Sequence, residues 1–419
     1  MKEKMKIALI GAGNIGSGVI EIIKNNAGLI RKRTGLEIGI EKIAVKDKSK
    51  HNDIAPGILT DNYEDIIKDN KIGTVVELIG GYEPARTIIL KAIRAKKNVV
   101  TANKAVLARY GEEIFKAAAE NNVKISFEAA VAASIPIIRA VRETLVSDNI
   151  KSIYGILNGT TNFILSRMEE DVSYQEALKK AQQLGFAEPD PSFDVDGLDA
   201  AQKLVILSRL AFNADIGEDI DVFGIAKIKS SDIAYAAELG YKVKLLAIAK
   251  KTGSHLEIKT QPVMIPDNHA LAAVNDEMNA IYLVSENSRE SMFYGRGAGK
   301  MPTASAVVSD IVGIGENERY NYQAKEKLEI KNKNSVQSRF YLRLMLIDKP
   351  GVLAQFTKIL GSNEISINAV LQKEQNREVV PVIVITHKAK QGNIELALKQ
   401  IEKLEAVKEK PIYMMIEDI

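Results

Sequence analysis

Short apolar runs alternate with amphipathic segments between residues 5 and 130. The runs are typical of buried strands, and the amphipathic segments place their apolar side chains on one face of a helix. Strands that alternate with helices at this spacing predict a doubly wound parallel sheet. The predicted strands span residues 6–10, 40–45, 74–79, 98–101 and 124–127, and the predicted helices span residues 17–25, 63–69, 84–95 and 111–120.

The alternation stops after Pro136. Helix-like stretches and strand-like runs then follow each other without a strict order, which predicts an α+β domain around a mixed sheet. The predicted helices span residues 162–169, 173–184, 200–210 and 233–239, and the predicted strands span residues 153–157, 243–250, 256–264 and 280–284.

A third pattern begins at Arg339, after a polar and charged stretch at residues 316–335. It has the order βαββαβ within about 80 residues, which indicates a small regulatory module. The chain is therefore expected to be an α/β protein with three domains. The module's predicted elements are a strand at 340–347, a turn at 348–351, a helix at 352–362, two strands, a helix at 393–404 and a strand at 412–416.

The amino-acid composition excludes several classes of functional site and binding partner. The 419 residues include 57 Lys and Arg, 54 Asp and Glu, four His and no Cys. Without cysteine there is no disulfide, thiolate metal site or cysteine nucleophile, and four scattered histidines do not favour a zinc site. A formal charge of +3 predicts neither a nucleic-acid nor a membrane partner. The N-terminal residues lack the apolar core of a signal peptide, and no run reaches about 18 apolar residues, so we expect a cytoplasmic location.

A glycine-rich loop, Gly11-Ala-Gly13-Asn-Ile-Gly16, joins the first predicted strand to a helical segment. In such a loop the first glycine permits a tight turn, and the second lets the backbone approach a pyrophosphate. The third allows close packing of helix and strand, and the N–H groups of the helix N-terminus bind the phosphates. The context favours a Rossmann-type dinucleotide site over a purely structural turn.

The residues after the second strand bear on the type of nicotinamide cofactor. Asp47 suits the ribose hydroxyl of NAD(H), whereas the neighbouring Lys46, Lys48 and Lys50 suit the 2′-phosphate of NADP(H). The lysines favour NADP(H), and NAD(H) remains possible. A solvated charged loop is the alternative interpretation.

Five carboxylates lie between Glu188 and Asp199. A calcium loop that began at Ser192 would place Lys203 where a bidentate glutamate is needed, which excludes that interpretation. Asp199 and Lys203 are at positions i and i+4 of a predicted helix. They are either a surface ion pair or a carboxylate that holds a lysine over a reacting carbonyl group.

Several motifs occur together in a fixed order. They are residues 11–16, 77–81, 101–104, 158–160, 187–203, 297–299 and 302–306. With these motifs the chain resembles the homoserine dehydrogenases of the long form, which carry a C-terminal ACT domain. The resemblance covers essentially the whole chain.

The resemblance implies an NAD(P)H-dependent interconversion of L-aspartate 4-semialdehyde and L-homoserine, on the route to threonine, methionine and isoleucine. Negative charge builds on the aldehyde oxygen during hydride transfer, and a lysine ammonium can stabilise and protonate it. By resemblance Lys203 and Lys104 are the catalytic lysines, Lys203 is the proton donor, and Asp199 is its acidic partner. The implied substrate-binding residues are Glu188, Asp194, Gly185, Asn158 and Thr160. The implied cofactor-binding residues are Gly11, Gly13, Asn14, Ile15, Gly16, Lys46, Gly80, Thr101, Lys104 and Gly299.

The resemblance also implies a monovalent cation, Na⁺ or K⁺. Its implied ligands are Glu128, Val131, Ala133 and Ile135. Family members commonly carry glycines in this segment, where the chain has Ala132-Ala133-Ser134. Glycine adopts a positive φ more cheaply than alanine or serine.

By the same resemblance, ACT modules pair and bind an amino acid at their interface. Threonine feedback inhibition is the natural expectation, with Gly351 and Asn368 near the ligand, in a homodimer or homotetramer. An ACT module that serves only assembly is the alternative. The expected domains are an NAD(P)-binding Rossmann domain at 1–134, a catalytic and dimerisation domain at 135–318, a linker at 319–338 and the ACT domain at 339–419. The segment near 302–315 is expected to pack back on the Rossmann domain.

Two other functions remain open from the residues. One is a dehydrogenase for another small amino acid, with the same fold and lysine. The other is a regulator that senses nucleotides and amino acids without catalysis. A sensor has no use for the residues from Glu188 to Lys203, and no recognition-helix pattern supports a DNA-binding output.

Overall fold

The computed structural model describes residues 4–52, 54–316, 324–373 and 377–419. It divides into two compact units. The first contains Met1–Leu157, Ala201–Asp219 and Asn279–Leu328, and the second contains Asn158–Ala200, Ile220–Met278 and Glu329–Ile419. The predicted boundary between residues 318 and 319 lies outside the described residues, and the three-domain division stays a prediction.

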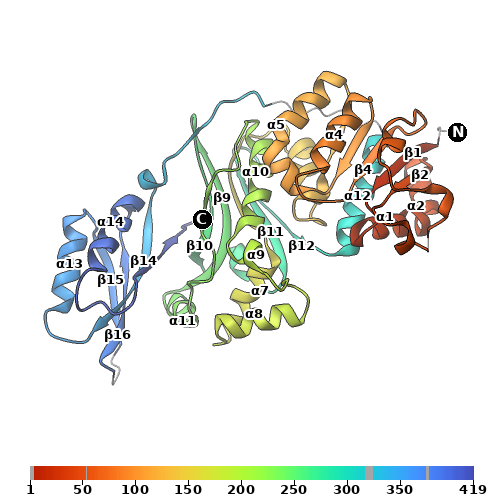
Figure 1. Ribbon diagram of the computed structural model, residues 1–419. Helices are drawn as coiled ribbons and strands as arrows, with labels where there is room; N and C mark the ends of the chain where they lie inside the picture. Colours follow the sequence, from red (N-terminus) through yellow and green to blue (C-terminus); the bar gives the residue numbers. More distant parts are fainter. Residues whose placement is uncertain (1–3, 53, 317–323, 374–376) are drawn as a thin grey trace. The chain divides into compact units, whose positions relative to one another are not determined.

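The first unit contains the predicted parallel sheet (Figure 1). Its six strands have the order β3-β2-β1-β4-β5-β6, and all of the pairs are parallel. The order reverses between β1 and β4, which is where doubly wound sheets bind their ligands. The strands are β1 (Met5–Ile10), β2 (Ile38–Ala44), β3 (Leu59–Thr60), β4 (Thr74–Glu77), β5 (Asn98–Thr101) and β6 (Ile125–Ser126). The connecting helices are α1 (Asn14–Asn25), α2 (Ala27–Thr34), α3 (Glu64–Ile67), α4 (Ala85–Arg94) and α5 (Lys104–Asn121).

Helices α5 and α2 differ from the sequence prediction. The helix expected at 111–120 begins earlier, at Lys104, because the Asn103 side chain accepts a hydrogen bond from the Val106 N–H and so caps the first turn. Helix α2 was not expected at all. None of its residues is buried, so it has no apolar face for periodicity to detect.

A helix from much later in the chain, α12 (Lys300–Gly315), packs on the parallel-sheet part of the unit (Figure 1). Gly18 of α1 lies so close to it that a Cβ atom there would be 2.9 Å from the Cβ of Ala304. Ala304, Val307 and Ile311 of α12 are fully buried with the strand residues Ile7 and Leu9 in one apolar cluster.

The first unit also contains β7 (Ile150–Ile156), β11 (Met278–Ser285, with Met278 at the unit boundary) and β12 (Glu290–Arg296). Their order is β12-β11-β7, and β11 is antiparallel to β7. Strand β12 was not predicted. Its side chains alternate between exposed and half-buried, and Tyr294 is 57% exposed, so it carries no continuous apolar signal.

The second unit contains a mixed sheet with the order β9-β10-β18-β14-β16-β15. Strand β10 is antiparallel to β9 and parallel to β18, so the mixed sheet expected from the sequence is confirmed. The strands are β9 (Tyr241–Thr252), β10 (His255–Pro266), β14 (Gln337–Ile347), β15 (Ile367–Gln372), β16 (Val379–Thr386) and β18 (Ile412–Ile416). The helices include α7 (Gly159–Met168), α8 (Tyr174–Gln183), α9 (Ser192–Val195), α11 (Ser230–Glu238), α13 (Val352–Ser362) and α14 (Gln391–Ile401).

The C-terminal elements follow the order β14-α13-β15-β16-α14-β18, which is the predicted βαββαβ module (Figure 1). One face of the module's sheet shares a core with the preceding part of the unit. Tyr341 of β14 and Met414 of β18 lie in the same apolar cluster as Met264 of β10 and Phe163 of α7. The module therefore packs against the preceding part of this unit through an apolar contact.

Candidate active site

The glycine-rich loop takes the geometry that dinucleotide binding requires. Gly11 has φ +104°, and a Cβ atom there would lie 2.9 Å from the Leu78 carbonyl oxygen. A Cβ on Gly16 would lie 2.3 Å from the Gly11 carbonyl oxygen, whereas a Cβ on Gly13 would face open space. Gly13 is the N-cap residue of α1, and no side chain makes a capping hydrogen bond to the first turn at Asn14 and Ile15. This end of α1 is free to bind an anion.

The neighbouring strand ends are organised by Glu77, a buried carboxylate at the end of β4. One of its oxygens accepts the N–H groups of Ile79 (2.9 Å) and Gly80 (3.2 Å), and the other accepts the Thr101 hydroxyl at 2.6 Å. Burial raises the pKa of Glu77. Thr101 in turn accepts the Asn103 N–H at 3.0 Å, and Lys104 follows as the first residue of α5. The sequence analysis includes Glu77 in the motif at residues 77–81 but assigns it no role, although a carboxylate inside an apolar strand was a visible signal.

After β2, Asp47 is already engaged by its own turn. Its carboxylate accepts the N–H (3.0 Å) and the hydroxyl (2.6 Å) of Ser49, and it lies 3.8 Å from the Lys50 ammonium. The Ser49 hydrogen bonds hold the pKa of Asp47 below its ordinary value. Lys46 is exposed, and we find no ion pair for it among the residues that the structure describes.

In the second unit, Asn158 joins two of the predicted carboxylates. Its amide donates to Asp194 at 2.7 Å and to Asp199 at 2.9 Å, and its carbonyl oxygen caps α7 by accepting the Thr161 N–H. The Thr160 hydroxyl lies 2.6 Å from the Phe186 carbonyl oxygen and 3.2 Å from Asp194. Four residues that were predicted separately from sequence therefore form one polar cluster: Asn158, Thr160, Asp194 and Asp199.

Glu188 lies in the segment between α8 and α9 and is exposed. Its backbone carbonyl accepts the Gln182 amide at 3.2 Å, and its carboxylate makes no hydrogen bond or ion pair within the described part of the chain. Gly185 follows α8 with φ +76°, a conformation that favours glycine. Gly185 is therefore the left-handed residue that follows the C-terminal end of helix α8.

In the first unit, the lysine of the acidic run is buried. Lys203 is 9% exposed, and its ammonium donates to the Leu157 carbonyl oxygen at 2.7 Å. Asp199 and Lys203 both lie on α10 (Leu198–Phe212), as expected, and Asp199 is 4% exposed. A buried ammonium on a backbone carbonyl, four residues from a buried carboxylate, is not an ordinary surface ion pair.

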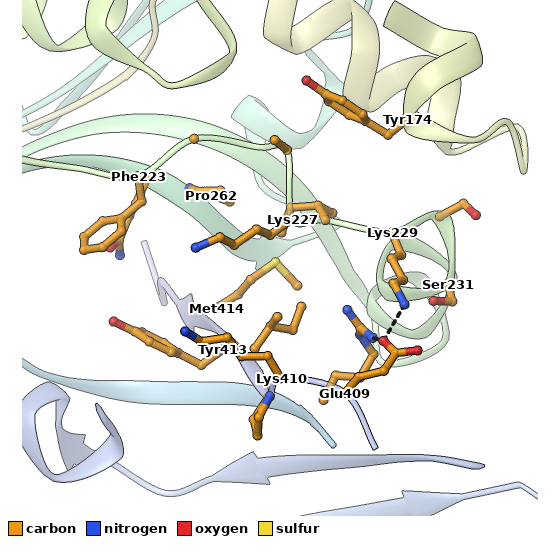
Figure 2. Close-up of a pocket in the computed structure, with 18 of the residues that line it drawn as sticks. Tyr174, Phe223, Lys227, Lys229, Ser231, Pro262, Glu409, Lys410, Tyr413 and Met414 are labelled. Atoms are coloured by element: carbon orange, nitrogen blue, oxygen red, sulfur yellow. Dashed lines mark hydrogen bonds and ion pairs between the residues drawn. The ribbon is translucent and has the colours of Figure 1, made fainter. Parts of the chain in front are cut away.

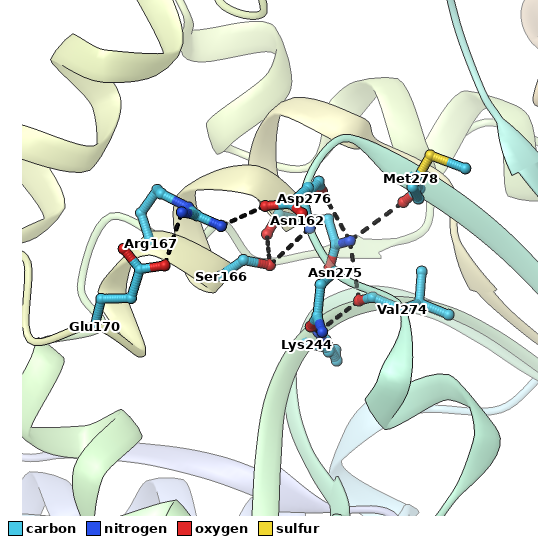
Figure 3. Close-up of polar contacts among 9 residues, drawn as sticks. All are labelled: Asn162, Ser166, Arg167, Glu170, Lys244, Val274, Asn275, Asp276 and Met278. Atoms are coloured by element: carbon cyan, nitrogen blue, oxygen red, sulfur yellow. Dashed lines mark hydrogen bonds and ion pairs between the residues drawn. The ribbon is translucent and has the colours of Figure 1, made fainter.

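Helix α7, which begins at the Asn158 cap, is held in its first turn by a second polar network (Figure 3). The Asn162 amide donates to the carbonyl oxygens of Val274 (3.1 Å), Asp276 (3.0 Å) and Met278 (3.2 Å). The fully buried Lys244 of β9 donates to the same Val274 oxygen at 2.7 Å. Sequence reasoning missed Lys244, since a lysine within a strand carries no local sign that it will be buried.

The segment predicted to hold a cation is buried and partly left-handed. Ala132 and Ala133 have φ values of 52° and 35°, so alanines occupy a conformation that favours glycine. The Glu128 carboxylate accepts the N–H groups of Ile138 (2.8 Å) and Arg139 (2.9 Å). Asp310 of α12 accepts the Glu128 N–H at 2.8 Å, and burial together with the nearby Glu128 raises the pKa of Asp310.

The remaining predicted positions lie at helix ends and on a strand. Gly299, with φ +121°, precedes α12, and the adjacent Lys300 lies 3.1 Å from Glu21 of α1. Gly351, with φ +87°, precedes α13, and Asn368 lies on β15; both are exposed. The regulatory role of these two positions stays a prediction.

An uncapped helix N-terminus beside a glycine loop, at the switch point of a parallel sheet, is the architecture of dinucleotide-dependent oxidoreductases. No helix in the described ranges is both long and apolar enough to cross a membrane.

Comparison with known proteins gives the particular family. Residues 11–128 match the NAD-binding domain of homoserine dehydrogenase, residues 136–312 match homoserine dehydrogenase itself, and residues 340–406 match the ACT domain. The homoserine dehydrogenase of Bacillus subtilis is 40% identical over 417 residues, which cover 97% of this chain and 96% of that protein. The chain belongs to the homoserine dehydrogenase family, and it is an oxidoreductase with NAD-binding, catalytic and ACT domains.

Comparison with solved structures indicates the same family. A homoserine dehydrogenase from Thiobacillus denitrificans has a TM-score of 0.93 at 41% identity, with 99% of each chain covered. A hyperthermophilic archaeal homoserine dehydrogenase in complex with NADPH has a TM-score of 0.66 at 28% identity and covers 77% of this chain and 100% of its own. The resemblance and the fold class expected from the sequence are confirmed, and the non-catalytic sensor is not supported.

Proposed function

We propose that the protein catalyses the reversible NAD(P)H-dependent reduction of L-aspartate 4-semialdehyde to L-homoserine, in threonine, methionine and isoleucine biosynthesis. The observation that carries this proposal is the buried ammonium of Lys203, held by the Leu157 carbonyl oxygen at 2.7 Å. The next residue, Asn158, holds the two carboxylates Asp194 and Asp199.

The roles follow from the charges that the substrate brings. When bound, the nicotinamide supplies the hydride in reduction and accepts it in oxidation. Lys203 stabilises the oxygen anion of the aldehyde and donates its proton, and Lys104 adds a second cation. The substrate ammonium needs acceptors, a role that suits Asp194 and the free carboxylate of Glu188.

The test is a steady-state assay of NADPH oxidation with aspartate semialdehyde as the substrate. We expect Lys203→Met to lower kcat by about 10²- to 10⁴-fold, the usual contribution of a positioned acid, while NADPH binding, measured by nucleotide fluorescence, is retained. Lys180→Met, on the exposed side of α8, is the matched control and should leave kcat unchanged. If Lys203→Met turned over at the wild-type rate, Lys203 would have no part in the reaction.

We propose further that NADP(H) is the preferred cofactor, although NAD(H) is also accepted. Asp47 is occupied by Ser49 and Lys50, whereas Lys46 is exposed and has no carboxylate partner in the described chain. A free lysine at the end of β2 attracts a 2′-phosphate.

Lys46→Ala should raise KM for NADPH by about 10-fold, which corresponds to about 1.4 kcal/mol, and leave KM for NADH unchanged. Lys68→Ala, another exposed lysine of the first unit, is the control. An equal rise for both cofactors would contradict a phosphate contact.

A monovalent cation, Na⁺ or K⁺, fits the segment from Glu128 to Ile135. We find no hydrogen bond to the carbonyl oxygens of Val131 and Ala133 in the parts of the chain that are described. Such oxygens, with the Glu128 carboxylate, are the donors that hard cations prefer; the Ile135 oxygen already accepts the Ile137 N–H at 2.7 Å. KCl should therefore raise the thermal midpoint more than tetramethylammonium chloride at equal ionic strength, and Glu128→Gln should remove that difference.

At the ACT module we propose that L-threonine inhibits the enzyme, with Gly351 and Asn368 near the amino acid and with pairing of modules in a homodimer or homotetramer. Support comes from the ACT match alone, because ACT modules bind amino acids. Inhibition by threonine that Asn368→Ala abolishes, with the basal rate retained, would support the proposal. A rate unchanged at saturating threonine would contradict the proposal and leave assembly as the role of the module.

A further inference from the structure

A large cavity lies within the second unit, beside the residues before α11, where β10, β18 and β14 are neighbouring strands of one sheet. Its volume is about 1070 Å³, enough for a small organic molecule. The lining comes from the start of α8, from Asp196, from residues 222–224 and 226–231, from Gln261 and Pro262 of β10, from Arg343 of β14, and from residues 409–415. Neither Gly351 nor Asn368 lines it, so this cavity is distinct from the threonine position proposed above.

One side of the cavity is apolar. Val222 and Phe223 come from β8 (Asp221–Val222) and the residue that follows it, Pro262 comes from β10, and Ile412 and Met414 come from β18. Phe223 is 36% exposed, a large aromatic surface to leave open in a pocket. Such a surface favours an aliphatic or aromatic body over a simple inorganic ion.

The rim of the cavity is cationic. Four cationic side chains, those of Lys227, Lys229, Arg343 and Lys410, line it against the carboxylates of Asp196 and Glu409. Glu409 is already shared, because it lies 2.6 Å from the Lys229 ammonium and 3.5 Å from the Arg343 guanidinium. These ion pairs satisfy Lys229 and Arg343.

Lys227 and Lys410 have no ion pair in the described ranges of the chain, and both are exposed. Figure 2 shows the Lys227 side chain extended across the cavity, between Phe223 and Met414. Two uncompensated ammonium groups beside an apolar wall are complementary to an anion that carries an apolar body.

We propose that this cavity binds a small organic anion, a carboxylate or sulfonate on an aliphatic or aromatic body. The anionic group lies against Lys227 and Lys410, and the body packs on Phe223, Pro262 and Met414. A ligand in this position contacts both the ACT strands and β10, so its binding stabilises the joint between them.

The test uses the full-length protein with 4-phenylbutyrate as the probe and 4-phenylbutyramide as its uncharged counterpart. Isothermal titration and the thermal midpoint measure binding, with and without saturating L-threonine. We expect saturable binding of the acid in the millimolar range, equivalent to about 4 kcal/mol, with at least about 10-fold weaker binding of the amide. Threonine should not compete.

The double variant Lys227→Gln/Lys410→Gln should bind 4-phenylbutyrate at least about 10-fold more weakly, with its turnover unchanged. The matched control is Lys399→Gln/Lys403→Gln, two exposed lysines of the same module that do not line the cavity. Equal affinity for acid and amide, equal affinity of the two double variants, or no saturable binding would overturn the proposal. These readouts do not depend on dehydrogenase activity, so they can fail independently of the proposed reaction.

Discussion

Glu77 shows how one buried residue can organise a binding surface although it has no place among the predicted site residues. Its carboxylate is fully buried, and it accepts hydrogen bonds from Ile79, Gly80 and Thr101, which lie on two adjacent strand ends. An ionised acceptor is suited to this place, because both of its oxygens accept at once.

Replacement of Glu77 by glutamine leaves an amide group where one acceptor oxygen was. We expect Glu77→Gln to lower the free energy of unfolding by about 1–3 kcal/mol, since buried donors lose their partners. KM for NADPH should rise more than kcat falls, because Gly80 and Thr101 lie at the proposed nucleotide site. Chemical denaturation and initial rates measure the two effects.

The matched control is Glu113→Gln, a partly exposed partner of Arg86 on α5. A surface change of this kind should shift the free energy of unfolding by less than about 1 kcal/mol. If Glu77→Gln behaved like the control, the hydrogen bonds around Glu77 would have no organising role.

At the scale of the element, strand β9 contains a lysine whose side chain is buried. Lys244 is fully buried, and its ammonium donates to the Val274 carbonyl oxygen and, at 3.2 Å, to the Asn275 side chain (Figure 3). Burial lowers the pKa of Lys244 to about 8. The strand therefore holds a charge that the folded state disfavours.

The lowered pKa of Lys244 determines the direction in which the free energy of unfolding changes with pH. An unfolded lysine keeps its proton up to a pKa of about 10.4, so between pH 8 and that value the unfolded chain binds more protons than the folded chain. The stability of the wild type relative to Lys244→Met should rise with pH in this window, by about 1–2 kcal/mol from about pH 7.5 to about pH 9.5. Urea unfolding at several pH values measures it, with the exposed Lys179→Met as the control. If the difference in unfolding free energy between the wild type and Lys244→Met did not change with pH, Lys244 would have an ordinary pKa.

At the scale of the second unit, a buried ion pair joins the ACT module to the preceding part. Arg343 of β14 lies 2.7 Å from Asp232 of α11, and Tyr341 of β14 donates to the same carboxylate at 2.8 Å. Asp232 is fully buried and Arg343 is 3% exposed. Removal of one partner would leave a buried charge without compensation.

We expect Arg343→Met to lower the free energy of unfolding by about 3–5 kcal/mol. The double variant Arg343→Met/Asp232→Asn should recover a large part of the loss, because the uncompensated carboxylate is gone. Lys373→Met is the control, because Lys373 pairs with Glu238 of the same helix but both side chains are 46% exposed. Its loss should be below about 1 kcal/mol. A single variant as stable as the wild type would show that the pair does not secure the module.

The whole chain also shows which features could be predicted from the amino-acid sequence. The apolar runs, the glycine loop and the βαββαβ order were predicted because each is a local pattern. Helix α2 and strand β12 were missed because their side chains face solvent on most sides and carry no apolar periodicity.

Local patterning thus defined the elements, the family and the types of side chain available for chemistry. Only the tertiary structure decided which of those side chains are buried and what they contact. Asn158 reaches Asp199 across 41 positions of the chain, and Arg343 reaches Asp232 across 111. Such contacts depend on how the elements pack, and the same lysine or carboxylate is a solvated charge at the surface and a positioned or costly one in the interior.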